Sequence, residues 1–230
     1  MTIRKDIPAL AVMLALSVAC ECAFAGDDNT VRFGLYAVLY HASGPDVSGP
    51  FTPTGLNADV PNVQTLYFAY LRRLTTNLQV EVAGGLPPDT DTVGKGPATV
   101  GSVPYNGKVL GHVKWLSPSA LLNYTFFDET HAWRPYVGVG VNYTHFYDRE
   151  TTAAGNAVLG GPTSITQSNS WGPAASVGIS FRPKQHWEVI TSFNWARVKS
   201  DLQLNTAGVV RQTTIDFHPT AFVFAMGYSF

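Results

Sequence analysis

The chain has 230 residues with 15 lysines and arginines, 16 aspartates and glutamates, and a formal net charge of −1 at pH 7. This balance provides no basic surface for nucleic acid, so we expect no nucleic-acid partner. Only 13% of the residues are charged and 12% are aromatic, whereas about a quarter of an average soluble domain is charged, and the length suffices for one domain or one closed sheet.

The N-terminus has the features of an export signal. Arg4 gives a positive start, an apolar run covers 7–19, and the small-x-small sequence at 23–25 is typical of a cleavage site. A membrane-anchoring helix is disfavoured, because the run is shorter than the roughly 18 to 20 apolar residues that span a bilayer. We therefore predict a signal peptide at 1–25 and a mature barrel domain at 26–230.

The only cysteines, Cys20 and Cys22, lie inside this signal. A lipoprotein signal ending at Cys20 is disfavoured, because Ser17 stands where a large aliphatic residue is usual. The mature domain then has no disulfide, and a closed hydrogen-bonded barrel supplies the constraint that a secreted fold needs. No later apolar stretch is long enough for a spanning helix, which leaves a soluble periplasmic protein or an outer-membrane barrel.

Large apolar side chains alternate with small or polar ones from position 31 to the C-terminus. The last segment shows this most clearly, since Phe222 and Phe224 share one face while Ala221 and Ala225 share the other. Its final residue, Phe230, resembles the C-terminal signature that the barrel-insertion machinery of bacteria reads. Eight segments near the ~9–11 residues of a tilted membrane strand show the alternation: 33–39, 66–70, 78–82, 118–126, 135–147, 171–181, 187–196 and 218–230.

The two faces of these segments distinguish a membrane barrel from soluble β-folds. Soluble sandwiches and lipocalin-like barrels also alternate, but they turn large apolar residues inward and polar residues outward. Here the smaller, more polar face is too small to fill a sandwich core, and the other face is almost devoid of charge. We therefore predict an all-β, eight-stranded antiparallel transmembrane β-barrel of the cell outer membrane, surrounded by outer-membrane lipids.

The connections between the segments alternate in length. Short turns at one end and long polar loops at the other are typical of outer-membrane barrels, and they place both ends of the barrel sequence on the periplasmic side. The long links are rich in Gly, Pro, Ser, Thr and Asn, so we expect turns rather than helix in them. The short links are 73–77, 128–134 and 183–186, and the long links are 42–61, 87–111, 148–170 and 199–214.

Four charged residues point inward by alternation near the periplasmic end: Arg32, Glu81, Arg182 and Glu188. Two positive and two negative side chains would meet at one level of the lumen. Unpaired charge there is costly, so we expect these residues to pair. We favour the interpretation that the cluster is a plug that stiffens the barrel floor, and the alternative is a polar gate.

The inward residues near the long links are apolar or aromatic. An eight-stranded barrel has just enough interior for side chains or for one small ligand, so this set either fills space or forms a pocket that opens outward. A solute in such a pocket would need a side exit. Pro118 removes a ladder donor within a strand, which marks either such an opening or a tolerated bend. The seven residues are Val38, Tyr40, Val113, Trp115, Phe146, Val198 and Phe217.

Three segments resemble the OmpW family of small outer-membrane barrels. Residues 133–144, WRPYVGVGVNYT, are similar to its RPYVGxGxNYT strand. Residues 112–120, HVKWLSPSA, are similar to its HxKxLPPT segment, with Ser117 in place of the first proline, and 218–230 resembles its DPxxxxxGYxF ending, with His218 where an acid is usual. The resemblance implies an eight-stranded barrel with a hydrophobic lumen, linked to uptake of small hydrophobic compounds, including alkanes in the AlkL branch, and to stress responses.

The apolar lumen and the resemblance together favour passive uptake or binding of small hydrophobic solutes, with no enzyme activity and no cofactor. The main alternative is a structural or adhesive barrel that acts through its extracellular loops. A lipid-modifying hydrolase is less favoured, because His41 and Ser43 lie two residues apart without an evident acid or oxyanion framework. The histidines lack metal-ligand spacing, so we expect no metal.

Overall fold

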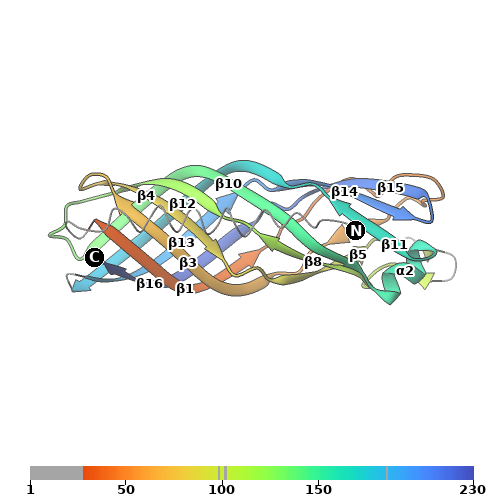
Figure 1. Ribbon diagram of the computed structural model, residues 1–230, viewed down its shortest axis with the longest axis horizontal. Coiled ribbons are helices and arrows are strands. Elements are labelled where there is room, and N and C mark those ends of the chain that lie inside the picture. Colours follow the sequence, from red (N-terminus) through yellow and green to blue (C-terminus); the bar gives the residue numbers. More distant parts are fainter. Residues whose placement is uncertain (1–27, 98, 101–102, 185) are drawn as a thin grey trace, which may run out of the picture.

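The structure is a computed structural model that describes residues 28–97, 99–100, 103–184 and 186–230. The predicted signal peptide at 1–25 lies outside the described residues. Eight antiparallel strands form the wall of a barrel (Figure 1): β1 (Asn29–Leu39), β3 (Val63–Arg73), β4 (Leu78–Gly85), β9 (Ser119–Thr125), β10 (Trp133–Thr151), β12 (Ser170–Lys184), β13 (Trp187–Ala196) and β16 (Thr220–Ser229).

The wall closes because the first of these strands pairs with the last. Leu35 of β1 lies opposite Phe224 of β16. The pairing of β10 with β12 completes the ring, and each wall strand therefore has two antiparallel neighbours. The order around the barrel is β1, β3, β4, β9, β10, β12, β13 and β16. A closed ladder satisfies backbone groups that lipid cannot hydrogen-bond. The predicted eight-stranded antiparallel barrel is confirmed.

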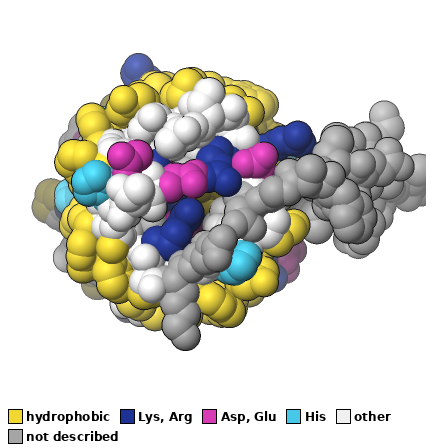
Figure 2. Space-filling model, turned by 90° about the vertical axis from the view of Figure 1, so that its left-hand side faces the viewer, with side chains coloured by type: hydrophobic (Ala, Val, Ile, Leu, Met, Phe, Trp, Pro, Cys, Tyr) yellow, Lys and Arg dark blue, Asp and Glu magenta, His cyan; other side chains and the backbone are white. Residues whose placement is uncertain are grey.

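The two faces of the wall have opposite characters. Phe33, Val139 and Phe224 are 53%, 67% and 51% exposed on the outside. Val223 and Ala225, which flank Phe224 in β16, are enclosed, with exposed fractions of 0% and 1%. A soluble fold would bury the large side chains instead. The exposed apolar belt, visible as a hydrophobic rim in Figure 2, is therefore a surface for acyl chains.

Aromatic rings mark both ends of this belt. In the paired strands β10 and β12, the Trp133 and Phe181 rings lie 4.3 Å apart at one end, and the Tyr143 and Trp171 rings lie 4.6 Å apart at the other. Aromatic girdles at both interfaces are typical of outer-membrane barrels. The distance between the two girdles defines the part of the wall that meets lipid.

The long links are more regular than the sequence analysis predicts. Our expectation of turns rather than helix in them was wrong, because they form further strands and one helix. These elements gather beyond one end of the barrel, on the right in Figure 1, which we call the hairpin end. They are β2 (Asn57–Asp59), β5 (Asp89–Lys95), β6 (Thr99–Val100), β7 (Val103–Pro104), β8 (Val109–Leu116), α2 (Ala153–Leu159), β11 (Thr163–Gln167), β14 (Lys199–Thr206) and β15 (Val209–Asp216).

Local signals explain both the helix and the strands. Helix α2 begins where the Thr152 hydroxyl accepts a hydrogen bond from the Gly155 amide, and it ends at Gly160, whose φ of 91° suits a glycine. In β14 the buried residues Leu202 and Leu204 alternate with exposed polar ones. The many turn-forming residues of the long links therefore led us to overlook the period-two alternation that these strands contain. Among the described residues, no helix is long and apolar enough to cross a membrane.

The wall continues into the hairpin end without a break on one side. Strand β10 is 19 residues long, and it pairs with β9 near Val139 and with β8 near Phe146. The link at 42–61 is tied to β15 through the bridges of Ser43 with Asp216 and of Ser48 with Gln212. The opposite end, where β3 turns into β4, β9 into β10 and β12 into β13, is called the turn end.

Candidate functional site

The turn end of the lumen contains a buried ion-pair network, which we call the charged floor and define as Arg32, Glu81, Arg182 and Glu188. The Arg32 Nε donates to Glu188 Oε1 at 2.6 Å, and its Nη1 donates to Glu81 Oε2 at 3.2 Å. All three of these side chains are at most 5% exposed. Arg182 is farther out, with Nη2 3.7 Å from Glu188 Oε2. The structure thus brings the four predicted residues together.

Neutral side chains complete this network. The Tyr67 hydroxyl donates to Glu81 Oε1 at 2.6 Å, and the Asn123 amide donates to Glu81 Oε2 at 2.6 Å. The Ser180 hydroxyl donates to Glu188 Oε2 at 2.8 Å. The sequence analysis missed these donors, although Asn123 could have been found as a polar residue on the inward face of a wall strand. Buried charge is tolerable when every oxygen is hydrogen-bonded in this way.

Small residues make room for the charged floor. A Cβ at Gly227 would lie 2.7 Å from Glu188 Cγ, and a Cβ at Gly138 would lie 2.0 Å from Asn123 Oδ1. Figure 2 shows the result from the turn end: charged side chains gather at the centre and hydrophobic ones surround them. Charged and polar side chains thus gather across the lumen at this level, an arrangement that both a plug and a polar gate would require.

An apolar cavity lies above the charged floor and holds about 1040 Å³ of atom-free space, counting the solvent at its mouth. Among the described residues that line it, none is Asp, Glu, Lys or Arg. Several of its polar lining side chains are hydrogen-bonded to each other, as where the Trp115 indole donates to the Thr90 hydroxyl at 3.0 Å. The seven residues predicted for the upper lumen all line this cavity: Val38, Tyr40, Val113, Trp115, Phe146, Val198 and Phe217.

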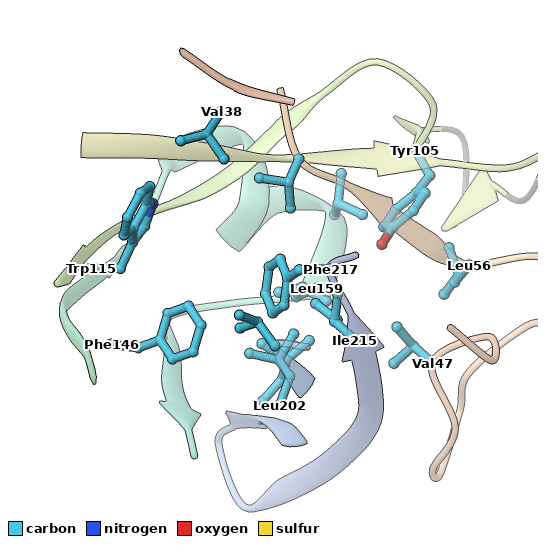
Figure 3. Close-up of a cluster of buried hydrophobic side chains, with 14 of the residues drawn as sticks. Val38, Val47, Leu56, Tyr105, Trp115, Phe146, Leu159, Leu202, Ile215 and Phe217 are labelled. Atoms are coloured by element: carbon cyan, nitrogen blue, oxygen red, sulfur yellow. The ribbon is translucent and has the colours of Figure 1, made fainter. Parts of the chain in front are cut away.

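Aromatic rings shape the upper part of the cavity. The Phe217 ring centroid lies 5.5 Å from that of Phe146 and 6.1 Å from that of Tyr40, and Tyr40 is 6.3 Å from Trp115, edge to face. Figure 3 shows Trp115, Phe146 and Phe217 directed into one space together with Leu202. Such a lining offers contact area with few directional polar groups, which suits apolar ligands of varied shape.

The sequence analysis missed part of this lining. Ile215 and Leu202 come from β15 and β14, in a link that we expected to be a polar loop, and both are buried against the cavity. Tyr36 and Ala221 also line it from the wall. Alternation along β1 and β16 was sufficient to predict Tyr36 and Ala221 as lining residues. Tyr36 is two residues from the predicted Val38 on the inward face of β1, and Ala221 lies opposite Val38 in β16.

One side of the wall is interrupted beside the cavity. The ladder between β4 and β9 ends at the pair Ala83 and Ser119, and the ladder between β5 and β8 resumes at Asp89 and Lys114. The chain between these pairs contains Pro118 and, on the other strand, two consecutive prolines at 87–88. Since Ala83, Gly84, Ser117 and Ser119 line the cavity, it reaches the wall at this interruption.

The residues considered for hydrolase chemistry lack a catalytic arrangement. The backbone amides of His41 and Ser43 pair with the carbonyls of Phe217 and Asp216 at the hairpin end. Among the described residues, no hydrogen bond joins the His41 and Ser43 side chains, and no group of three or more His, Cys, Asp or Glu side chains could hold a metal ion. The geometry supports binding by shape and apolar contact.

Comparison with known proteins identifies the family. Residues 28–230 match the model of the OmpW family. Outer membrane protein W of Vibrio cholerae is 28% identical over 229 residues, covering 99% of this chain and all of that protein. The dibenzothiophene metabolism operon protein PahQ of Pseudomonas aeruginosa is 27% identical over 173 residues, covering 75% and 74%. The crystal structure of OprG from Pseudomonas aeruginosa superimposes with a TM-score of 0.79 at 23% identity, covering 88% of this chain and 95% of that one. The chain belongs to the OmpW family of outer-membrane β-barrel proteins.

Proposed function

We propose that this barrel takes up small hydrophobic molecules passively across the outer membrane. The observation that carries the proposal is an apolar cavity directly above the charged floor, with no Asp, Glu, Lys or Arg among the described residues that line it. An apolar solute gains free energy there by leaving water, at about 25 cal/mol per Å² of buried apolar surface. A polar solute finds few free partners, so the cavity discriminates by polarity.

The floor and the wall interruption together suggest a route. The hairpin end faces outward and the turn end faces the periplasm, as in outer-membrane barrels generally. A solute that enters at the hairpin end meets Arg32, Glu81 and Glu188 below, where passage would require breaking buried ion pairs. The interrupted ladder between Ser119 and Lys114 is the alternative exit, and it leads sideways into the acyl chains.

One relative supports the solute class. PahQ is named as a protein of a dibenzothiophene metabolism operon, and dibenzothiophene is a flat apolar aromatic molecule. The aromatic lining of this cavity, with the Phe146 and Phe217 rings stacked at 5.5 Å, would offer faces to such a molecule. We therefore include small aromatic hydrocarbons in the proposed solute class.

The test is solute uptake by Gram-negative cells that lack other OmpW-family proteins and express this chain. We expect faster uptake of radiolabelled naphthalene than in vector cells, and no change for glucose, a polar solute of similar size. Ala221→Trp places a large ring in the cavity, since Ala221 lines it and is 4% exposed, and should return naphthalene uptake to the vector level. Leu35→Trp, at a side chain that is 63% exposed on the outer face of β1, is the control and should transport normally.

Two outcomes would contradict the proposal. Equal acceleration of naphthalene and glucose would indicate a water-filled pore rather than an apolar pathway. Normal uptake by the folded Ala221→Trp variant would show that solutes do not pass through this cavity. Folding of each variant is checked by heat-modifiable migration in gel electrophoresis, so loss of the barrel is not mistaken for loss of transport.

A second function has one observation in its favour. Phe51 is 87% exposed at the hairpin end, in the link that bridges to β15, and an exposed aromatic there could contact a surface outside the cell. An adhesive barrel would lose surface binding in a Phe51→Ser variant while naphthalene uptake stays unchanged. Loss of uptake with unchanged surface binding in the Ala221→Trp variant would favour transport instead.

A further inference from the structure

A second cavity lies at the hairpin end and adjoins the first. It is walled by residues of the extra strands and of α2, and it holds about 650 Å³ of atom-free space, counting open solvent. Four residues line both cavities: Thr92, Val113, Gln167 and Leu202. A single elongated molecule could therefore place one end in each cavity.

Arg211 of β15 lines this outer cavity and is unusually buried for an arginine. Its exposed fraction is 9%, and its Nη1 makes only long hydrogen bonds, to the Leu159 carbonyl at 3.3 Å and the Thr206 hydroxyl at 3.4 Å. Within the part of the chain that the structure describes, no carboxylate forms an ion pair with Arg211, and its Nε and Nη2 make no hydrogen bond. The guanidinium therefore has only neutral acceptors, and its remaining N–H groups could receive an anion.

Arg149 of β10 lines the same cavity because of a bulge. The register between β10 and β8 shifts between Tyr147 and Glu150, and Asp148 has a φ of 52°. Simple alternation from the inward Phe146 would turn residue 148 inward, but the bulge points Asp148 outward to Lys114 and brings Arg149 to the cavity instead. The Arg149 Nη1 donates to the Gln167 carbonyl at 2.8 Å, again a neutral acceptor.

The other lining residues supply no negative charge. Neither cavity has an Asp or Glu among its lining residues. His112 lines the outer cavity, and its Nδ1 is hydrogen-bonded to Asp91 at 2.7 Å. Tyr105 is a neutral donor, because burial, and secondarily the charge of Asp46, raises its pKa to about 12. The two joined cavities therefore carry an excess of positive charge at their outer end and none deeper in.

We propose that the outer cavity binds the carboxylate of an amphipathic monocarboxylic acid between Arg149 and Arg211, while the alkyl tail extends through the shared lining into the apolar cavity. This inference rests on the proposed function and narrows its solute class. A guanidinium and a carboxylate match in geometry and charge. A single negative charge suits the site, because most other lining residues are apolar, such as Leu56, Leu110 and Ile165, and a doubly charged phosphate would need more donors.

The test measures equilibrium binding to the barrel in zwitterionic lipid nanodiscs, with empty nanodiscs subtracted for partition into lipid. The probes share a ten-carbon tail: decanoate, decanol and decyltrimethylammonium. We expect decanoate to bind roughly tenfold to a hundredfold more tightly than decanol, the gain of a charge-assisted hydrogen-bonded pair, and decyltrimethylammonium to bind more weakly than decanol.

Matched variants assign this preference to the two arginines. R149M and R211M keep the length and apolar stem of the side chain but remove its charge, and each should lower decanoate affinity towards that of decanol while leaving decanol binding within about twofold. R149K and R211K should retain part of the preference. Arg197→Met is the control, since Arg197 is exposed and lines neither cavity, and it should behave as the unchanged protein.

The outcomes separate this inference from the proposed function. Equal binding of decanoate and decanol, or an undiminished decanoate preference in the folded R149M and R211M variants, would overturn the carboxylate site and leave the apolar cavity intact. Binding of neither decanoate nor decanol above empty nanodiscs would overturn the proposed function as well. Because each arginine is replaced singly, failure of one variant to fold still leaves the other as a test.

Discussion

The Arg32 Nε lies 2.6 Å from Glu188 Oε1, and this ion pair joins the first wall strand to the seventh across 156 positions of sequence. A second hydrogen bond from the same guanidinium reaches Glu81 of β4 at 3.2 Å. One cation therefore holds two carboxylates that come from opposite directions around the barrel. The lumen is crossed at this level by a network whose members depend on each other.

Removing the shared cation should be costly. In Arg32→Met, Glu81 and Glu188 would remain buried beside each other without Arg32, and breaking a buried ion pair typically costs about 3–5 kcal/mol. We expect a loss of that size in the free energy of unfolding, measured by urea denaturation in lipid vesicles. Lys114→Met is the control: its ion pair with Asp148 is exposed, so a much smaller loss is expected. Similar losses in both variants would refute a structural role for the charged floor.

The packing beside this ion pair should leave no room for a side chain at position 227. In Gly227→Ala the new Cβ would lie 2.7 Å from Glu188 Cγ and 2.8 Å from its Oε1, so the floor must shift, at a cost of about 1–3 kcal/mol. Gly84→Ala is the matched control in another wall strand, because its nearest atom would be the Pro118 Cα at 3.7 Å, an ordinary contact. The measurement is the urea midpoint of each variant. A tolerated Gly227→Ala would mean that the floor is loosely packed.

The sequence predicts the wall well because lipid imposes a simple rule. Period-two alternation of large and small residues is a direct consequence of a wall that is one residue thick, with acyl chains outside and a narrow lumen inside. The same rule placed Arg32 and Glu188 in the lumen and near one end, since heights follow from strand positions. Their contact could be predicted as well, because two opposite charges at the same level of a low-dielectric lumen pair rather than stay buried without a partner.

The strands of the hairpin end were not predicted, because the lipid constraint that makes the wall predictable is missing there. No bilayer constrains this end, so the buried positions of β14 and β15 include polar residues such as Ser200 beside apolar ones such as Leu202 and Ile215, and their hydrophobic contrast is weak. The bulge at Asp148 also breaks the alternation on which the inward assignment depends, and Arg149 was not recognised as a lining residue. Alternation assigns faces only while the register is continuous.

The turn between β9 and β10 should show a depressed carboxyl pKa. The Thr130 hydroxyl, the His131 ring and the Thr130 amide donate to Asp128, and they lower its pKa to about 2 from 3.8. A group whose pKa is lowered by folding stabilises the turn at pH above 3.8, and this stabilisation is lost as pH falls towards 2. Carbon-13 NMR of the Asp128 carboxyl should give a midpoint near 2. Thr130→Ala should shift the midpoint upward towards 4, and an unchanged midpoint would show that the hydroxyl is not the main cause.

Pro118 links the stability of the wall to the proposed exit. It lies opposite Tyr143, whose amide donates to the Pro118 carbonyl at 3.0 Å. In an antiparallel ladder such a pair exchanges two hydrogen bonds, but proline has no N–H to return. Pro118→Ala should restore the bond to the Tyr143 carbonyl and stabilise the barrel by about 0.5–1.5 kcal/mol.

The same substitution should slow transport. The restored bond lies on the β10 side of position 118, and it should hold residues 117–119 more firmly against β10, which stiffens one border of the interruption through which we propose that solutes leave. We expect naphthalene uptake to fall severalfold while cavity binding, measured with decanol, stays unchanged. Thr125→Val, a change at the far end of β9, serves as the comparison for general effects on that strand. Unchanged uptake in a folded, stabilised Pro118→Ala barrel would contradict an exit that needs this border to move, because a stiffer border must slow any solute that has to displace it.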